Sequence, residues 1–346
     1  MKFKKLSKTD IDVSLICLGT MTWGEQNSQE EAFSQMNYSV DAGINFFDTA
    51  ELYAVPPKAD TYTKTETMIG NWFQEKKNRD QIILATKISG PGPSWIRGGG
   101  KQYNEQSISE AIEGSLKRLQ TDYIDLYQLH WPERITNFFS KLGYKHDKKE
   151  DEWNSFESIL TVLKKFVEQG KIRHIGLSNE TPYGLSKYLN LSETLNLPRV
   201  VSVQNPYSLV NRTYEVGMAE ISIRDQAGLL AYSPLGFGVL SGKYLNNQMP
   251  EGSRLKLYGS SFPRYQGTRT SRAVEEYFLI AKKHNLSLTQ MSLAFVNQQE
   301  FVTSNIIGAT TLDQLKENID SININLGAEL LEEINIIHNE NPNPAP

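Results

Sequence analysis

Four titratable side chains stand where apolar runs of the sequence end. Asp48 follows "INFF", Lys87 follows "IILAT" and His130 follows "YIDLYQL", while Tyr53 comes five residues after Asp48. If the three runs are neighbouring parallel strands, their carboxyl ends meet on one face and the four side chains converge there. A carboxylate, an ammonium, an imidazole and a phenol in one place would form a proton-transfer site.

Tyr53 is the expected proton donor of such a site. A phenol has an ordinary pKa of about 10, and an ammonium about 4 Å away favours the phenolate by about 4 kcal/mol at an effective dielectric of ~20. We therefore expect Lys87 to lower the pKa of Tyr53. Asp48 would hold Lys87 charged and in place while reducing part of this effect. A neutral His130 would donate a hydrogen bond to a substrate oxygen.

Each of these residues also has an ordinary interpretation when taken alone. An Asp at a strand end often caps a turn, a Lys there is usually solvated, Tyr53 could shelter the rim, and His130 could be a packing residue. Lys87 at a strand end could also form a Schiff base with a carbonyl substrate, as in an aldolase. The residues alone leave these interpretations open.

The elements that must position the four residues follow an alternating pattern. Runs rich in β-branched and aromatic residues alternate with segments of helical period, such as 28–43, 107–119 and 151–170. The predicted strands cover residues 14–19, 44–50, 81–87, 123–130, 172–178, 200–206, 228–234 and 304–310. Such alternation implies parallel pairing with right-handed crossovers. Eight units favour an α/β fold, a closed (β/α)8 TIM barrel formed by one domain over residues 1–346.

An open doubly wound sheet would show the same alternation. However, no "GxGxxG" follows the first strand, and no segment resembles an interdomain linker. Residues 1–14 predict an N-terminal β-hairpin that caps the bottom of the barrel. The segments 271–284, 287–298 and 328–339 predict accessory C-terminal helices, followed by a loose tail over 340–346. The long insertions 88–106 and 131–150 follow the third and fourth strands, where we expect mobile walls around a ligand.

Composition excludes several classes of protein. The net charge of -4 does not indicate the basic surface that binds nucleic acid. No segment has the apolar length of a signal peptide core or a membrane span. We therefore expect a cytoplasmic protein with a small-molecule substrate and no nucleic-acid or membrane partner. The single Cys17 excludes an internal disulfide, and scattered histidines without "HExxH" indicate that no metal is used.

Several motifs resemble the signature regions of the aldo-keto reductase superfamily. They are "GINFFDTAELY", the Lys of "LATK", the His of "LYQLHWP" and the late "IIGATTLDQLKENI". The likeness runs from "LGTMTWG" to Asn318, and it is strongest to the bacterial Tas-like branch, with potassium-channel β-subunits more distant. The resemblance implies NADPH-dependent reduction of aldehydes or ketones on a TIM barrel. It places the catalytic tetrad on Asp48, Tyr53, Lys87 and His130, with Tyr53 as the acid.

The resemblance also implies where NADPH would bind. Ser178, Asn179 and Gln204 would hold the nicotinamide carboxamide, and Tyr232 would stack on the nicotinamide ring. Main-chain amides of the loop after Tyr232 and the side chain of Lys243 would contact the pyrophosphate. The cofactor-binding residues expected from the resemblance are Gly19, Thr20, Met21, Asp48, Ser178, Asn179, Gln204, Tyr232, Ser233, Pro234, Leu235, Gly236, Gly238, Lys243, Arg254, Gly308, Thr310, Gln314, Glu317 and Asn318.

The last of the similar motifs, "IIGATTLDQLKENI", concerns the adenosine half of the cofactor. A helix is predicted to begin near Leu312 with Thr310 or Thr311 as its N-cap, and its free amides would suit the adenosine 2′-phosphate. Arg254 would also meet this phosphate. Trp23, Tyr53 and Trp131 would line an apolar substrate pocket. The likeness to channel subunits leaves a second possibility open, a cofactor-binding regulatory subunit with little turnover.

Overall fold

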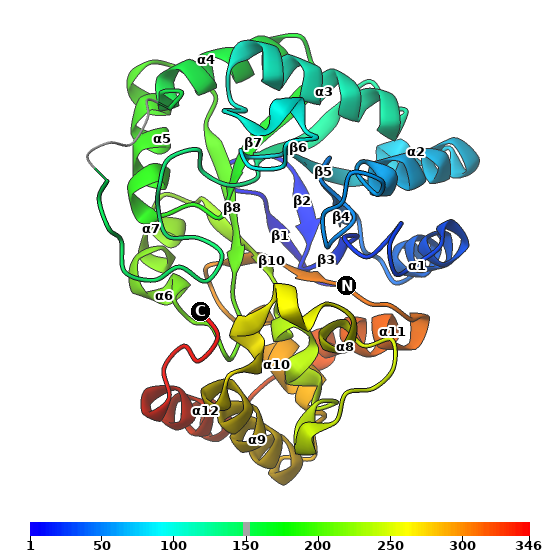
Figure 1. Cartoon of the computed structure of the whole chain (residues 1–346), viewed down its shortest axis with the longest axis vertical. Coiled ribbons are helices and arrows are strands. Elements are labelled where there is room, and N and C mark those ends of the chain that lie inside the picture. The colour runs from blue at the N-terminus through cyan, green and yellow to red at the C-terminus, as the bar shows by residue number, and fades with distance from the viewer. Residues whose placement is uncertain (148–152) are drawn as a thin grey trace.

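Eight parallel strands form a closed barrel at the centre of the molecule (Figure 1). The computed structural model describes residues 1–147 and 153–346. In order around the barrel the strands are β10 (Val302–Ile307), β3 (Ile16–Gly19), β4 (Phe46–Asp48), β5 (Ile83–Ile88), β6 (Ile124–Leu129), β7 (Ile172–Ser178), β8 (Val200–Pro206) and β9 (Gly228–Tyr232). This arrangement confirms the predicted (β/α)8 TIM barrel.

The side chains inside the barrel form an apolar layer and a polar layer. The apolar layer is a buried cluster of strand and hairpin residues, namely Leu6, Val13, Cys17, Phe46, Ala85, Leu126, Val201, Leu230 and Ile306. Because alternate residues of a strand share one face, the next inward side chains on β4, β5 and β6 are Asp48, Lys87 and Gln128. The polar residues therefore face inward, one layer nearer the carboxyl ends of the strands.

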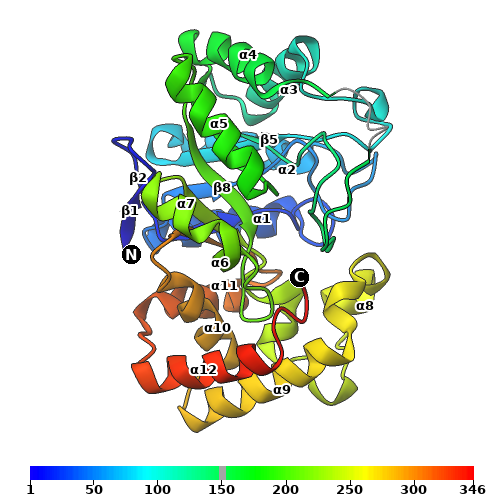
Figure 2. The same ribbon diagram turned by 90° about the vertical axis from the view of Figure 1, so that its left-hand side faces the viewer.

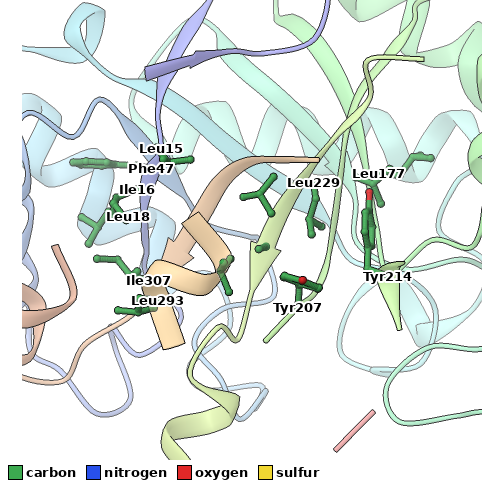
Figure 3. Packing of buried hydrophobic residues seen from close by; sticks show 14 of the residues in the cluster. Leu15, Ile16, Leu18, Phe47, Leu177, Tyr207, Tyr214, Leu229, Leu293 and Ile307 are labelled. Atoms are coloured by element: carbon green, nitrogen blue, oxygen red, sulfur yellow. The ribbon is translucent and has the colours of Figure 1, made fainter. Parts of the chain in front are cut away.

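The outer faces of the strands pack against a ring of helices. Ile16, Leu18, Phe47, Leu177, Leu229 and Ile307 share one large buried cluster with helical residues such as Leu293 (Figure 3). The helices around the barrel are α1 (Gln29–Asp41), α2 (Lys64–Lys76), α3 (Glu105–Leu119), α4 (Phe156–Glu168), α5 (Pro182–Thr194), α6 (Tyr214–Gly217), α7 (Ala219–Arg224) and α11 (Leu312–Asp320).

Local sequence signals explain where several of these helices begin. The side chain of Ser28 accepts from the Glu31 amide while Glu31 bonds back to the Ser28 amide, which forms a capping box before α1. The side chains of Asn104 and Ser155 accept from amides of the first turns of α3 and α4, without the return bond of a capping box. The helical segments predicted at 28–43, 107–119 and 151–170 correspond to α1, α3 and α4, except that residues 151 and 152 lie outside the described ranges.

A short antiparallel hairpin covers the amino-terminal end of the barrel, as predicted. It consists of β1 (Phe3–Lys5) and β2 (Asp12–Ser14), and it lies at the left of Figure 2. Leu6 and Val13 are fully buried in the inner apolar cluster. The hairpin therefore closes the end of the barrel that lies opposite the polar layer.

The accessory helices gather on one side of the barrel. They are α8 (Arg254–Tyr258), α9 (Thr268–Lys283), α10 (Leu288–Asn297) and α12 (Ala328–Glu340), and α9 and α12 lie side by side at the bottom of Figures 1 and 2. The three helices predicted in this part of the chain are present. In the ranges that the structure describes, no helix has both the length and the apolar character needed to cross a membrane.

The last residues of the chain differ from the prediction of a loose tail over 340–346. Ala345 is fully buried, and its amide donates to the Val210 carbonyl at 3.0 Å. The Arg264 guanidinium donates to the Pro346 carbonyl at 3.3 Å. The tail is held because its main chain and its one apolar side chain find partners that the tail sequence alone does not reveal.

The two long insertions contain little regular structure. Residues 89–104 follow β5 and residues 130–147 follow β6, and their only helical piece in the described ranges is a 3₁₀ turn at Arg97–Gly99. Residues 148–150 of the second insertion lie outside the described ranges. Both insertions start at the carboxyl end of the barrel, so they stand next to the polar layer.

Candidate active site

The four titratable residues lie together at the carboxyl end of the barrel. Lys87 Nζ lies 2.7 Å from Asp48 Oδ2 and 3.4 Å from the Tyr53 hydroxyl oxygen. The His130 ring meets the Tyr53 ring edge-on, with 5.8 Å between the ring centroids. The structure therefore brings together all four predicted catalytic side chains.

Asp48 is held by a set of donors on both of its oxygens. Lys87 binds Oδ2, while Oδ1 accepts from Gln204 Nε2 at 2.7 Å and from Gln128 Nε2 at 3.1 Å. Lys87 also donates to the Thr49 carbonyl at 2.7 Å. A buried carboxylate tolerates loss of water when it is paired and hydrogen-bonded in this way. Asp48 therefore fixes the position of the ammonium next to Tyr53.

The pKa of Lys87 remains high although the side chain is fully buried. Burial alone lowers the pKa of Lys87, but the charge of Asp48, and then that of Tyr53, raise it above its ordinary value. The ammonium is therefore charged at neutral pH.

The pKa of Tyr53 does not follow the expectation from the sequence. Burial is the largest effect and raises the pKa, Lys87 lowers it, and the charge of Asp48 raises it again, with a net increase. The prediction that Lys87 brings the pKa of Tyr53 below its ordinary value is wrong, because loss of hydration of the phenolate outweighs the attraction of the ammonium. Lys87 offsets part of the increase, and Tyr53 is a protonated phenol at neutral pH.

His130 is neutral, as the proposed hydrogen-bonding role requires. Burial, and after it the charge of Lys87, lowers the pKa of His130 well below its ordinary value. Its Nδ1 is buried and has no hydrogen-bond partner among the described residues. Its main chain is anchored, because Asn179 Nδ2 donates to the His130 carbonyl at 2.9 Å. A neutral imidazole keeps one N–H donor for a ligand.

A cavity of about 1010 Å³ opens beside this group. Asp48, Tyr53 and His130 line it, and Lys87 lies behind them without reaching its surface. The predicted cofactor residues that line the same cavity are Gly19, Thr20, Met21, Asp48, Ser178, Asn179, Gln204, Tyr232, Ser233, Pro234, Leu235, Gly238, Lys243, Arg254, Gly308, Thr310, Gln314, Glu317 and Asn318. The cavity is at the upper end of the size range of small-molecule sites.

The predicted pocket residues Trp23 and Trp131 have different locations. Trp131 lines the cavity, and its Nε1 donates to the Pro91 carbonyl at 3.1 Å. Trp23 does not line it, because its side chain is fully buried in the main core and its Nε1 donates to Gln35 Oε1 at 3.2 Å. The prediction of Trp23 as a pocket residue is therefore wrong.

Polar side chains from three consecutive strands form one wall of the cavity. The Tyr232 hydroxyl donates to Asn179 Oδ1 at 2.7 Å, and Asn179 Nδ2 lies 3.1 Å from Ser178 Oγ. Ser178 in turn donates to the Gln204 carbonyl at 2.9 Å. These bonds fix the orientation of side chains that the resemblance assigns to nicotinamide binding.

Only some of the predicted residues in the loop after β9 line the cavity. Gly238 lines the cavity with φ of +96°, a left-handed conformation that glycine adopts without strain. Gly236 does not line it, and the amides of Gly236 and Gly238 already donate to the carbonyls of Ser233 and Leu235 at 2.9 Å. The expectation that these two amides face a pyrophosphate is wrong, because the 3₁₀ turns of the loop use them internally.

Two cationic side chains, Lys243 and Arg254, also line the cavity. The Arg254 guanidinium lies 3.9 Å above the Phe237 ring, and its Nε and Nη2 are buried without a hydrogen-bond partner among the described residues. Burial lowers the pKa of Arg254 to about 10 and, together with Arg254, lowers the pKa of Lys243. Buried cations without an acceptor are unfavourable, so this region is suited to an anion.

The amino-terminal end of α11 faces the same cavity. Thr311 is its N-cap, as predicted, and accepts from the Gln314 amide at 3.3 Å. Gln314 Oε1 accepts from the Thr310 amide at 3.1 Å, and Asn318 Nδ2 donates to the Gly308 carbonyl at 3.2 Å. Gln314 and Asn318, two of the cofactor-binding residues expected from the resemblance, therefore line the cavity and are already oriented by neighbours.

Some residues of the site were missed from the sequence. Gln128 binds Asp48, and a signal for it existed, because it stands two residues before His130 and must share the inner face of β6. Arg264 and Phe139 line the cavity. These two come from irregular segments, where no periodicity indicates which side chains turn inward.

Comparison with known proteins gives consistent matches over the whole chain. The model of the Aldo/keto reductase family matches residues 15–339. "Protein tas" of Escherichia coli is 47% identical over 348 aligned residues that cover 100% of both chains. An "Aldo-keto reductase" of Babesia bovis is 39% identical over 75% of this chain and 96% of its own, and "Uncharacterized oxidoreductase YrpG" of Bacillus subtilis is 32% identical over 97% and 96%.

Proposed function

This chain belongs to the aldo/keto reductase family of oxidoreductases, and from this premise we propose that it reduces aldehydes or ketones to alcohols with NADPH. The observation that best supports the proposal is the contact between the Lys87 ammonium and the Tyr53 hydroxyl at the floor of a large cavity. A protonated phenol beside a fixed positive charge is an acid whose anion is stabilised as soon as it forms.

Each of the four residues has a separate role in the proposed reaction. Tyr53 donates its proton to the carbonyl oxygen, and the charge of Lys87 stabilises the phenolate that remains. Asp48 holds Lys87 in place, and the neutral His130 donates a hydrogen bond that orients the carbonyl. Bound NADPH supplies the hydride that adds to the carbonyl carbon, so that the products are an alcohol and NADP⁺.

The residues around the cavity fit this cofactor. Lys243 and Arg254 offer positive charge and pair with no carboxylate among the described residues, which suits phosphate groups, and the end of α11 adds a helix N-terminus. Asn179, Gln204 and Tyr232 would hold the nicotinamide end near Tyr53. Since the adenosine 2′-phosphate distinguishes NADPH from NADH, the unpaired Arg254 supports a preference for NADPH.

The apolar side chains that line the cavity near Tyr53 favour an uncharged substrate. Val55, Pro93, Trp131 and Phe139 line the cavity there, and the Phe139 ring meets the Trp131 ring at 5.7 Å between centroids. None of these side chains could pair with a charged substituent. We therefore infer a small apolar or aromatic carbonyl compound as the substrate.

A panel of aldehydes and ketones tests the function. The absorbance of the reduced cofactor is followed with NADPH and with NADH for the native protein and for Tyr53→Phe. We expect consumption of NADPH by the native protein and a loss of turnover of roughly 100- to 10,000-fold in Tyr53→Phe, with cofactor affinity little changed. Full turnover in the variant would show that Tyr53 is not the acid.

A second variant tests the cofactor preference separately. Arg254→Met should raise the Kd of NADPH by roughly tenfold to a hundredfold, the value of a charge-assisted hydrogen bond, while the Kd of NADH stays the same. Arg224→Met is a matched control, because Arg224 is exposed and bonds only to Glu220 in the described contacts. Equal losses for both cofactors would contradict the assignment.

The two alternatives from the sequence make different predictions in the same assays. An aldolase would need Lys87 as a nucleophile, but Lys87 is fully buried in an ion pair behind the cavity surface, which disfavours it. A regulatory subunit would bind NADPH without consuming it on any carbonyl of the panel. Rapid consumption would therefore exclude the regulatory role as the sole function.

A further inference from the structure

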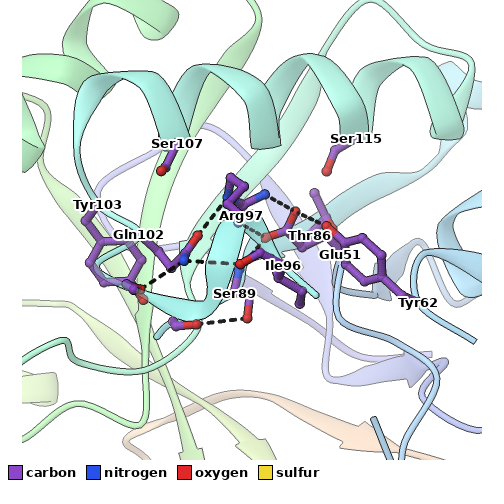
Figure 4. Close-up of polar contacts among 12 residues, drawn as sticks. Glu51, Tyr62, Thr86, Ser89, Ile96, Arg97, Gln102, Tyr103, Ser107 and Ser115 are labelled. Atoms are coloured by element: carbon purple, nitrogen blue, oxygen red, sulfur yellow. Dashed lines mark hydrogen bonds and ion pairs between the residues drawn. The ribbon is translucent and has the colours of Figure 1, made fainter. Parts of the chain in front are cut away.

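A second buried ion pair lies beside the site and has no part in the proposed proton transfer. Glu51 stands between Asp48 and Tyr53 in the chain and is almost fully buried. Arg97 binds it through both terminal nitrogens of its guanidinium, with 2.5 Å from Nη2 to Oε1 and 3.0 Å from Nη1 to Oε2 (Figure 4). The two residues belong to different segments, because Arg97 lies in the insertion after β5.

Glu51 connects the turn that carries Tyr53 to the strand that carries Lys87. Its Oε1 accepts from the Ser89 amide at 2.7 Å, and its own amide donates to the Lys87 carbonyl at 3.2 Å. On the other side, its Oε2 accepts from the Tyr62 hydroxyl at 3.1 Å. These contacts of Glu51 add to the pairing of β4 with β5 and help to fix the turn that carries Tyr53 relative to the main chain of Lys87.

Arg97 brings the insertion after β5 onto this carboxylate. Its Nε donates to Gln102 Oε1 at 2.7 Å, which closes the insertion on itself. The adjacent Ile96 is buried in one apolar cluster with Leu52, Tyr53 and Trp131. The segment that Arg97 anchors thus contributes to the same apolar cluster as Tyr53.

The two charges depend on each other because water does not reach Glu51. Burial lowers the pKa of Arg97, but its hydrogen bond and charge interaction with Glu51 raise the pKa above the ordinary value, so the guanidinium stays charged. Without Arg97, the donors left to the buried carboxylate among the described residues would be the neutral Tyr62 hydroxyl and Ser89 amide, and such a charge is strongly unfavourable. Both segments would then have to move to hydrate Glu51.

We propose that Glu51 and Arg97 are positioning residues that hold the Tyr53 hydroxyl at its distance from Lys87 and fix residues 89–102, which contribute Pro93 to the lining of the cavity. This inference rests on the proposed function, since it concerns the geometry of the same proton transfer. Neither residue contacts the reacting atoms, and Glu51 and Arg97 do not line the cavity.

Kinetics of three variants test the proposal. Arg97→Met should lower kcat roughly 10- to 100-fold, the effect of a small misplacement of a catalytic group, with little change in the KM for NADPH. The alkaline fall of the rate should move to higher pH as Tyr53 leaves the ammonium. Arg97→Lys should restore part of kcat, and so should the double variant Glu51→Gln with Arg97→Met, which removes the unpaired charge.

The matched control is Arg118→Met, which breaks a similar ion pair elsewhere. Arg118 Nε lies 2.7 Å from Oε2 of the fully buried Glu66, and Glu66 accepts from Thr86 of β5 at 2.6 Å. This variant should lower the Tm while kcat and the pH profile stay native at a temperature well below the Tm. A loss of kcat in Arg118→Met equal to that in Arg97→Met would reduce the effect to general destabilisation and overturn the proposal.

Amide hydrogen exchange tests the same inference without any turnover. In Arg97→Met the amides of Glu51, Thr63 and Ser89 should exchange faster, while in Arg118→Met they should exchange at the native rate. If the native protein reduces no carbonyl compound, the proposed function fails and the exchange result still decides whether the pair holds the two segments. Unchanged exchange in Arg97→Met, or faster exchange with native kcat, would refute the positioning role.

Discussion

Among single residues, Lys87 combines complete burial with a permanent charge. Its ammonium depends on Asp48, and Asp48 depends on Lys87 together with Gln128 and Gln204. Lys87→Met would leave the carboxylate buried without its counter-charge, so we expect the free energy of unfolding to fall by about 3–5 kcal/mol. Urea denaturation measures this change.

A double variant separates the charge from the lost contacts. Lys87→Met with Asp48→Asn removes both charges, and it should be more stable than Lys87→Met alone although turnover stays low in both. If the double variant were the less stable of the two, the buried carboxylate would not be the cause of the loss.

The lowered pKa of His130 should make the stability of the protein depend on pH. Because its pKa is lowered in the folded protein, the unfolded chain binds a proton first as the pH falls below about 6.5. This contribution to stability is complete above that pH and is lost on acidification by about 1.4 kcal/mol per pH unit until the folded pKa is reached.

His130→Asn tests this dependence. Urea denaturation between pH ~7.5 and ~5.5 should show a smaller loss of stability in the variant than in the native protein. Some loss should remain in both, since His174 and His338 also have lowered pKa values. Identical slopes would show that His130 does not titrate differently in the folded and unfolded chains.

The sequence predicted which titratable residues meet but not their energetics. Asp48, Lys87 and His130 could be placed because each ends an apolar strand of a regular barrel. The net pKa of Tyr53 could not, since its burial depends on Leu52, Ile96 and Trp131, all of which come from irregular segments. The contact between Glu51 and Arg97 joins two loops, and no local pattern predicts such a pair.

On the scale of elements, the packing of α2 on α3 depends on a missing side chain. A Cβ at Gly70 of α2 would lie 2.0 Å from the Arg118 carbonyl of α3. Gly70→Ala should therefore force the helices apart and destabilise the protein by about 1–3 kcal/mol, although alanine favours helix formation. Thermal denaturation measures the change.

Gly114→Ala on α3 is the matched control. A Cβ there would meet only the flexible end of the Arg118 side chain, so stability should stay the same or rise by up to about 1 kcal/mol. A gain in both variants would mean that α2 and α3 can separate without loss.

The strands and long helices could be predicted because their periodicity is a property of each segment. All eight predicted strands overlap the observed ones. The tail was misjudged for the opposite reason: "NPNPAP" has no periodicity, and it is held by residues distant in sequence, such as Val210 and Arg264. Trp23 likewise reads as an aromatic near a strand end, and only the folded core shows that it points away from the cavity.

On the scale of the whole molecule, the apolar layer closed by the hairpin and the cavity lie at opposite ends of the barrel. The hairpin buries Leu6 and Val13 at the amino-terminal end, and the cavity opens at the other. Leu6→Ala should lower the free energy of unfolding by about 2–5 kcal/mol with kcat and KM unchanged at a temperature where the variant is folded. A change in kcat would show that the apolar layer transmits strain to Asp48 and Lys87.

The docked tail has a practical consequence for handling the protein. Pro346 lies against Arg264, a residue of the cavity wall, whereas the first residue lies beside the hairpin on the far side (Figure 2). An affinity tag or carrier fused after Pro346 would emerge next to the cavity mouth and crowd it. Fusion ahead of Met1, or immobilisation on a support through that end, would leave the opening directed toward the solution.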